Sequence, residues 1–254
     1  MTRLHGHHAL VTGAGTGIGA AIARALDAEG ATLTLVGRRR APLEAVAHDL
    51  AGALAVPGDV TRREEVDAAF EMAHAAHGPV TLLVNNAGMA RSLPFAKLSV
   101  GDWREIIDVN CNALFHCCQA ALPDLLKAEA GRIVTIASTA GLKGYAYSAP
   151  YVAAKHGAIG LTRALAAEFA KTDLTINAVC PGFTDTDMVG ETVERLSGKT
   201  GRDAEEIRAD IAAFNPQGRL LDPAEIASAV IWLCLPENRS ITGQAIAVAG
   251  GEVM

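Results

Sequence analysis

The sequence predicts an α/β fold in which one parallel sheet is covered by helices on both faces. Short apolar segments alternate along the chain with longer helical patterns, as in doubly wound sheets whose strands are buried on both sides. The chain has 254 residues, 50% of them apolar, and it contains no internal repeat or linker, so we expect a single domain spanning 1–254. Seven strands are expected, at residues 9–12, 32–36, 54–56, 81–85, 132–137, 175–179 and 245–248.

Composition and charge argue against several function classes. The net charge of −6 and the pI of about 5.7 provide no basic footprint for nucleic acid or an anionic membrane. No apolar run reaches the ~18 residues needed to span a bilayer, and the N-terminus lacks a secretion signal. Five cysteines without C-x-x-C spacing and eight histidines without zinc-ligand spacing predict reduced thiols and no catalytic metal. We therefore expect a soluble, cytoplasmic protein.

The first expected strand leads directly into a glycine-rich turn and then into a helix at about 17–29. A helix N-terminus presents free N–H groups and a positive dipole end to a pyrophosphate, and glycine lets the phosphate approach closely. A tight turn that only packs the helix onto the strand is the alternative. The candidate contacts are Gly13, Thr16, Gly17, Ile18 and Gly19.

Other helix starts carry local signals. They are a capping box at Thr61 and Glu64, Pro42 near a first turn, and Asp222-Pro223 followed by Glu225.

A tyrosine and a lysine lie four residues apart in a helical pattern, with a serine thirteen positions upstream of the tyrosine. Because residues i and i+4 share a helix face, we expect the Lys155 ammonium to lie near the Tyr151 phenol. A neighbouring ammonium would lower the pKa of Tyr151 from ~10 toward the pH at which acid–base catalysis is efficient. A surface pair without function is the alternative for this spacing alone.

Several separated motifs occur in a fixed order, and together they resemble short-chain dehydrogenases/reductases of the classical type over about residues 4–251. The nearest likeness is to 3-oxoacyl-carrier-protein reductases and related hydroxyacyl dehydrogenases. The resemblance implies a Rossmann-type sheet of strand order 3-2-1-4-5-6-7 and an NAD(P)-dependent enzyme that interconverts a ketone and a secondary alcohol. The motifs are Thr12 to Gly19, Asp59-Val60, Asn85 to Gly88, Asn110, Ser138, Tyr151 to Lys155, and Pro181-Gly182 with Thr186.

The resemblance also implies four catalytic residues. Ser138 would position the substrate oxygen, Tyr151 would transfer the proton, and Lys155 would bind the nicotinamide ribose and lower the pKa of Tyr151. Asn110 would bend its helix and hold a water that relays protons, with a surface or capping role as the alternative. Because all four are present, a non-catalytic dinucleotide-binding regulator is disfavoured.

The second expected strand bears on the choice of cofactor. It ends in Gly37-Arg38-Arg39-Arg40, without the acidic residue that would hold the adenosine ribose of NAD. Cations are disfavoured before a helix N-terminus, and a nearby phosphate would relieve them. We therefore expect NADP with contacts from Arg38 and Arg39, and a solvated basic turn with NAD as the alternative.

Further cofactor contacts follow from the resemblance. Asp59 and Val60 would meet the adenine, although a turn or capping role for Asp59 is the alternative. The remaining contacts would be Asn86, Ala87 and Gly88 on the adenosine side and Pro181, Gly182, Phe183, Thr184 and Thr186 around the nicotinamide.

The same likeness predicts a substrate lid at about 188–215 and a homotetramer built on the helices at about 103–127 and 149–171. The substrate would be a small ketone or alcohol, including one carried on coenzyme A or acyl-carrier protein. Apolar pocket walls could come from Leu93, Phe95, Leu142, Tyr145, Tyr147 and Met188.

Overall fold

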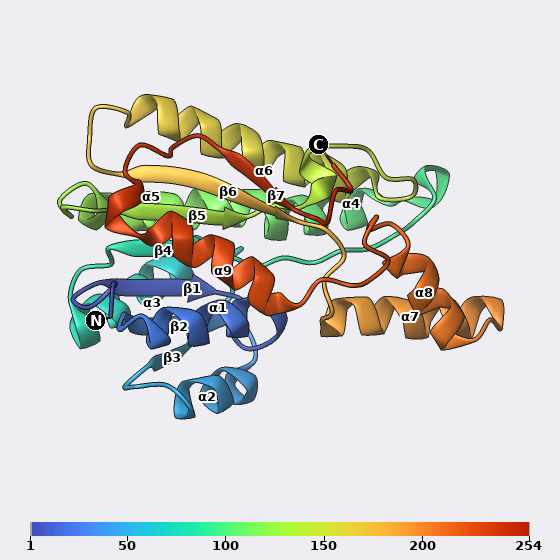
Figure 1. Cartoon of the computed structure of the whole chain (residues 1–254), viewed down its shortest axis with the longest axis horizontal. Helices are drawn as coiled ribbons and strands as arrows, with labels where there is room; N and C mark the ends of the chain where they lie inside the picture. The colour runs from blue at the N-terminus through green and yellow to red at the C-terminus, as the bar shows by residue number, and fades with distance from the viewer. Residues whose placement is uncertain (1, 254) are drawn as a thin grey trace.

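The computed structural model describes residues 2–253, and its central element is a seven-stranded parallel sheet (Figure 1). The strand order β3-β2-β1-β4-β5-β6-β7 confirms the expected topology. Every expected strand is present, with ends that shift by no more than two residues. The strands are β1 (His8–Thr12), β2 (Thr32–Gly37), β3 (Leu54–Pro57), β4 (Leu82–Asn85), β5 (Arg132–Ile136), β6 (Thr175–Pro181) and β7 (Ala245–Val248).

Helices cover both faces of the sheet, and each layer encloses its own apolar core. The helices α1 (Gly17–Ala28), α2 (Arg40–His48) and α9 (Pro223–Cys234) pack on one face, and α3 (Arg63–His77), α5 (Ala113–Leu125) and α6 (Ala149–Glu168) pack on the other. Successive strand residues point to opposite faces. In β1, Val11 belongs to the first core and Leu10 to the second, which explains why these strands are apolar throughout.

One expected capping box is wrong. Helix α3 begins at Arg63, and the Thr61 side chain caps nothing, because its N–H and hydroxyl both donate to the Asp59 carboxylate, at 3.0 and 2.8 Å. Such Asx-type bonds compete with helix caps. At α9 the expected capping box is present between Asp222 and Glu225.

The long helical pattern at 103–127 is interrupted. Helix α4 (Val100–Ile107) and α5 are separated by a π-helical turn, η2 (Asp108–Asn112). The fully buried Asn110 lies within this turn, and its Nδ2 donates to the Ile106 carbonyl at 2.9 Å. An inserted π turn re-aims the residues that it contains, so the helix departs from regular geometry at the residue where we expect a bend.

Two helices after β6 stand apart from those covering the sheet (Figure 1). They are α7 (Asp187–Thr200) and α8 (Ala204–Ala212), joined through Gly201 at φ 69°. Their apolar side chains form a separate small cluster with Val189, Val193, Ile207 and Ile211 at its centre. The other regular elements among residues 2–253 are the short 3₁₀ turns η1 (Phe95–Lys97), η3 (Thr139–Gly141) and η4 (Pro236–Asn238).

Within residues 2–253, no helix is both long and apolar enough to cross a bilayer. The five cysteines are free thiols. Across the same residues, no three His, Cys, Asp or Glu side chains are grouped as a metal site would require.

Candidate active site

A cavity of about 440 Å³ lies where the central strands end, bordered by the glycine turn, α6 and α7. Ligands bind outside the carboxyl ends of the strands in open α/β sheets. With one exception, every candidate cofactor and catalytic residue identified from the sequence lines this cavity. The exception is Asn110, which lies just behind it: a β-carbon on Gly88 would stand 3.0 Å from Asn110 Oδ1.

The glycine turn is built so that backbone approaches backbone. Gly13 has φ +64°, and a β-carbon on Gly19 would lie 2.2 Å from the Gly13 carbonyl oxygen, which no side chain could tolerate. Thr16 precedes α1 without forming a side-chain cap, so the N–H groups of the first turn are left for another partner. A phosphate is the partner that this arrangement suits.

The turn is tied to the end of β4 by Thr12 and Asn86. The Thr12 hydroxyl accepts hydrogen bonds from the backbone N–H groups of Asn86 and Ala87, each at 3.0 Å. The Asn86 amide donates to the Thr12 and Gly13 carbonyls, also at 3.0 Å. Thr12, which our sequence reasoning did not assign to the site, therefore fixes the floor of the cavity.

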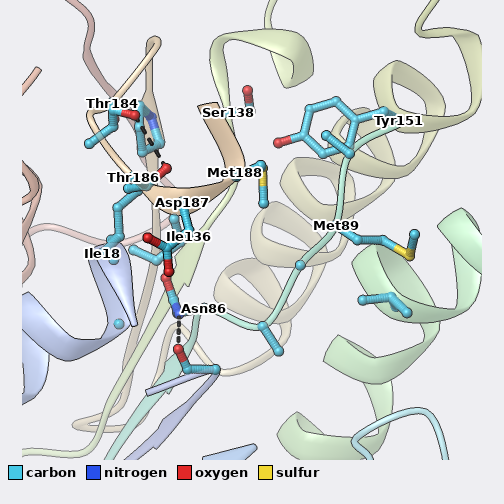
Figure 2. Close-up of a pocket in the computed structure, with 18 of the residues that line it drawn as sticks. Ile18, Asn86, Met89, Ile136, Ser138, Tyr151, Thr184, Thr186, Asp187 and Met188 are labelled. Atoms are coloured by element: carbon cyan, nitrogen blue, oxygen red, sulfur yellow. Dashed lines mark hydrogen bonds between the residues drawn. The ribbon is translucent and has the colours of Figure 1, made fainter. Parts of the chain in front are cut away.

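A second helix N-terminus faces the first. Thr186 precedes α7 and forms no side-chain cap, and a β-carbon on Gly17 would lie 3.1 Å from Thr186 Cγ2. Figure 2 shows Ile18, Thr184 and Thr186 on the same side of the cavity. The positive ends of two helix dipoles thus meet where a pyrophosphate would bind.

Two of the three arginines after β2 line the cavity. Arg38 and Arg39 are exposed and lie at its edge, whereas Arg40 turns away to pair with Glu44 at 3.2 Å. The basic turn therefore leaves Arg38 and Arg39 facing the cavity.

The Asp59 carboxylate lies at the same end. Burial raises its pKa, but the hydrogen bonds from Thr61 and the charges of Arg38 and Arg62 outweigh this effect and hold the pKa below its usual value. Asp59 is consequently ionised near neutral pH. It both terminates the turn before α3 and lines the cavity.

Ser138, Tyr151 and Lys155 are brought together by β5 and α6. In Figure 2 the Ser138 side chain and the Tyr151 hydroxyl both extend into the cavity and approach one another. Ser138 Oγ accepts from the backbone N–H of Ala140 at 3.1 Å, so its own hydrogen is free to be donated elsewhere. Lys155 Nζ lies 5.6 Å from the Tyr151 ring centroid and donates to the Ile136 carbonyl at 2.8 Å.

The expected effect of Lys155 on its neighbour is wrong for this structure. Burial raises the pKa of Tyr151, and the nearby Ser138 side chain opposes the change only in part. Burial also lowers the pKa of Lys155 to about 8. Both groups are withdrawn from water, and the Lys155 ammonium is directed at the Ile136 carbonyl rather than at the phenol oxygen.

Several residues that shape the cavity escaped sequence reasoning. Met89 follows the Asn86 to Gly88 motif directly, and Asp187 and Ile211 belong to α7 and α8, yet all three line the cavity. No local pattern distinguishes them, because their positions depend on how distant segments meet. Of the six apolar residues proposed as pocket walls, Tyr145 and Met188 line the cavity.

Comparison with known proteins places the chain in a family. The profile of the short chain dehydrogenase family matches residues 7–197. A putative ketoacyl reductase of Streptomyces coelicolor is 38% identical over 96% of this chain and 95% of its own length. A 3-oxoacyl-[acyl-carrier-protein] reductase, FabG, of Salmonella typhimurium is 38% identical over 98% of each chain.

Solved structures agree with this assignment. An actinorhodin polyketide ketoreductase variant crystallised with NADPH superposes with a TM-score of 0.93 at 37% identity and 97% coverage of each chain. The aldohexose dehydrogenase of Thermoplasma acidophilum gives 0.90 at 32% identity, covering 99% of this chain and 95% of that one. The chain therefore belongs to the short-chain dehydrogenases/reductases, a family of NAD(P)-dependent oxidoreductases, and is related to the ketoacyl reductases within it.

Proposed function

We propose that this protein is an NADP-dependent reductase of ketones, acting on a 3-oxoacyl thioester or a similar small ketone, with the secondary alcohol as product. The observation that carries the proposal is the convergence of the Ser138 and Tyr151 hydroxyls in a cavity that also has a phosphate-binding turn. The names of its relatives, among them ketoacyl reductases, support the same substrate class.

The residues present fit a dinucleotide phosphate. A side chain at Gly19 would clash with the backbone at the turn, and the first turn of α1 has open N–H groups, as a bound pyrophosphate requires. Arg38 and Arg39 line the adenosine end and would hold the 2′-phosphate of NADP, with Asp59 and Val60 beside the adenine. The nicotinamide end would be held by Lys155 and by the segment from Pro181 to Thr186.

The chain's own groups would manage the substrate oxygen. The bound cofactor supplies hydride to the carbonyl carbon. Ser138 donates a hydrogen bond to the oxygen and fixes its position, while Tyr151 donates the proton that converts it to a hydroxyl. Lys155, with its ammonium held by the Ile136 carbonyl, would bind the nicotinamide ribose beside Tyr151. The relay water expected at Asn110 stays a prediction, since both amide hydrogens of that side chain already bond to backbone carbonyls.

The substrate end of the cavity favours an acyl group. Met89, Phe183, Met188 and Ile211 line it and would give an acyl chain apolar contacts, although Ser92, Asp187 and Thr192 also line the cavity. An NAD-dependent alcohol or hydroxyacyl-coenzyme A dehydrogenase is the second candidate, because the exposed arginine pair leaves room for an unphosphorylated ribose and could stay solvated beside it.

Further expectations belong to this proposal. The chain acts as one domain in the cytoplasm, and residues 188–215, which span most of α7 and α8, close over the substrate. We also propose a homotetramer formed through the helices at 103–127 and 149–171. The exposed side chains of Trp103 in α4, Phe115 in α5 and Leu126 directly after α5 support an interface there. Light scattering on the purified protein would measure the assembly.

The proposal is tested by cofactor titration followed by a substrate panel. NADPH and NADH binding would be measured by nicotinamide fluorescence, and NADPH oxidation would then be followed with acetoacetyl-coenzyme A, simple ketones and an aldohexose. We expect tighter binding of NADPH and turnover of the ketones. Equal affinity for both cofactors would contradict the choice of NADP, and turnover of the sugar alone would contradict the substrate class.

A further inference from the structure

A carboxylate from the C-terminal tail is buried behind the wall of the substrate pocket. The Glu252 side chain is 1% exposed, and its Oε1 accepts a hydrogen bond from the Tyr145 hydroxyl and lies 3.0 Å from Lys143 Nζ. Its Oε2 has no hydrogen-bond partner among residues 2–253, and a β-carbon on Gly182 would stand 2.9 Å from it. Burying a carboxylate is costly unless partners compensate, so this placement calls for a reason.

Tyr145 is the pocket wall that the carboxylate holds. Its ring lines the cavity, and its hydroxyl lies 2.6 Å from Thr139 Oγ1 as well as bonding to Glu252. The ring meets Phe183 edge-to-face, with centroids 6.2 Å apart and an angle of 89°. Lys143 Nζ lies 5.0 Å from the centroid of the same ring. The hydroxyl and the ring of Tyr145 are therefore restrained independently.

These contacts join three segments that are far apart in the sequence. Thr139 directly follows Ser138 after β5, Gly182 and Phe183 follow β6, and Glu252 follows β7. The Tyr145 hydroxyl thus couples the tail to the turn after β5. This turn positions Ser138, whose hydroxyl would face the substrate oxygen. A rigid wall at this point sets how much space remains beside the reacting carbonyl.

We propose that Glu252 is a positioning residue that fixes Tyr145 as a rigid wall, and that Tyr145 determines specificity by limiting the size of the group attached to the carbonyl carbon. The inference rests on the proposed ketone reduction. Without the anchor the edge-to-face contact with Phe183 and the Lys143 ammonium still hold the ring. The ring then moves more easily, which opens space for a larger substituent and loosens the alignment of a small one.

The test compares Glu252→Gln, Tyr145→Phe and the double variant with wild type. Glu71→Gln, on an exposed carboxylate of α3, and Tyr147→Phe, whose residue is outside the cavity lining, are matched controls. The readouts are kcat and KM for NADPH-dependent reduction of a short methyl ketone and a bulky aryl ketone, the NADPH Kd, the thermal midpoint, and a crystal structure of Glu252→Gln.

We expect both single variants to lower kcat for the short ketone by about tenfold and to raise the ratio of kcat/KM for the bulky over the short ketone by about fivefold. NADPH affinity should stay within about twofold, and the double variant should be no worse than the more affected single variant, because coupled residues are not additive. The crystal structure should show the Tyr145 ring displaced, and the controls should behave as wild type.

Three outcomes decide between the claims. The inference would be overturned if the folded variants kept the wild-type ratio of kcat/KM for the two ketones, or if the effects of the two substitutions were additive in the double variant. In that case an active wild type would still support the proposed function. A wild type that reduces neither ketone would contradict the proposed function, and the position of the Tyr145 ring in Glu252→Gln would then decide the anchoring role. If Glu252→Gln does not fold, Tyr145→Phe carries the test alone, since it keeps the ring and removes only the hydroxyl.

Discussion

The side chain of Asn110 bonds to the backbone of Met89 in both directions. Asn110 Nδ2 donates to the Met89 carbonyl at 2.9 Å, and Oδ1 accepts from the Met89 N–H at 3.2 Å. A residue inside an irregular helix thereby fixes the loop after β4. The residue before Met89 in this loop is Gly88, where a β-carbon would lie 3.7 Å from Lys155 Nζ. The π turn is thus tied directly to the cavity wall.

Replacing Asn110 by alanine should therefore lower stability as well as activity. The change leaves the Met89 N–H and carbonyl without partners and removes the side-chain bond to the Ile106 carbonyl, and we expect a loss of about 3 kcal/mol in the free energy of unfolding. Urea denaturation measures it. The control is Asn112→Ala, because exposed Asn112 bonds only to Asp108 and should cost less than about 0.5 kcal/mol. Equal losses in the two variants would contradict this role.

Removing the Tyr151 hydroxyl tests the proton donor. Tyr151→Phe should lower kcat for ketone reduction by about 10²–10⁴, the usual contribution of a general acid, and should leave the NADPH Kd within about threefold. Steady-state kinetics and fluorescence titration measure the two quantities. Retention of wild-type kcat would rule out the assigned donor.

The arginine pair should determine the choice between the two nicotinamide cofactors. Arg38→Ala and Arg39→Ala should each weaken NADPH binding by about tenfold or more, the value of a charge-assisted contact, and should leave NADH binding unchanged. Arg40→Ala is the matched control, since Arg40 pairs with Glu44 instead of facing the cavity. If NADPH affinity fell equally in all three variants, the effect would come from the overall positive charge, and the specific contacts of Arg38 and Arg39 would be contradicted.

The two directions of the reaction should respond differently to pH. Because burial holds the pKa of Tyr151 above its usual value, the phenol is protonated at neutral pH and ready to donate. Reduction should then be flat between pH 6 and about 8, while alcohol oxidation, which needs the phenolate, should rise by about tenfold per pH unit. Initial rates in both directions check this. An oxidation rate already constant from pH 7 would mean that the phenolate forms earlier than the structure indicates.

Lys155 should make stability depend on pH in the alkaline range. Its pKa falls from 10.5 in the unfolded chain to about 8 in the fold, so folding favours the neutral amine. The stabilisation is fully present above pH 10.5 and is lost as the pH falls through about 8, a change of roughly 3 kcal/mol. Urea unfolding from pH 7 to 10.5 should therefore show a smaller rise for Lys155→Met than for wild type, and parallel curves would refute the shifted pKa.

The sequence by itself determined the sheet and most of the cavity lining. The strands could be identified from short apolar runs. The glycine turn could be identified from a strand followed by Gly13 to Gly19 and a helix, because only glycine allows the backbone to approach backbone so closely there. The local sequence also predicted the α9 capping box correctly. The same kind of prediction was wrong at Thr61, because Asp59, two residues away, accepts its hydrogen bonds instead.

The tertiary structure alone decided the features that depend on distant segments meeting. The pKa of Tyr151 is raised where the spacing predicted a lower value, because both groups are buried and the Ile136 carbonyl accepts a hydrogen bond from the Lys155 ammonium. Glu252 reaches Tyr145 only because β7 ends beside β6. Spacing along a helix reports which side chains are neighbours, but desolvation and contacts between loops are set by the packing of the whole chain.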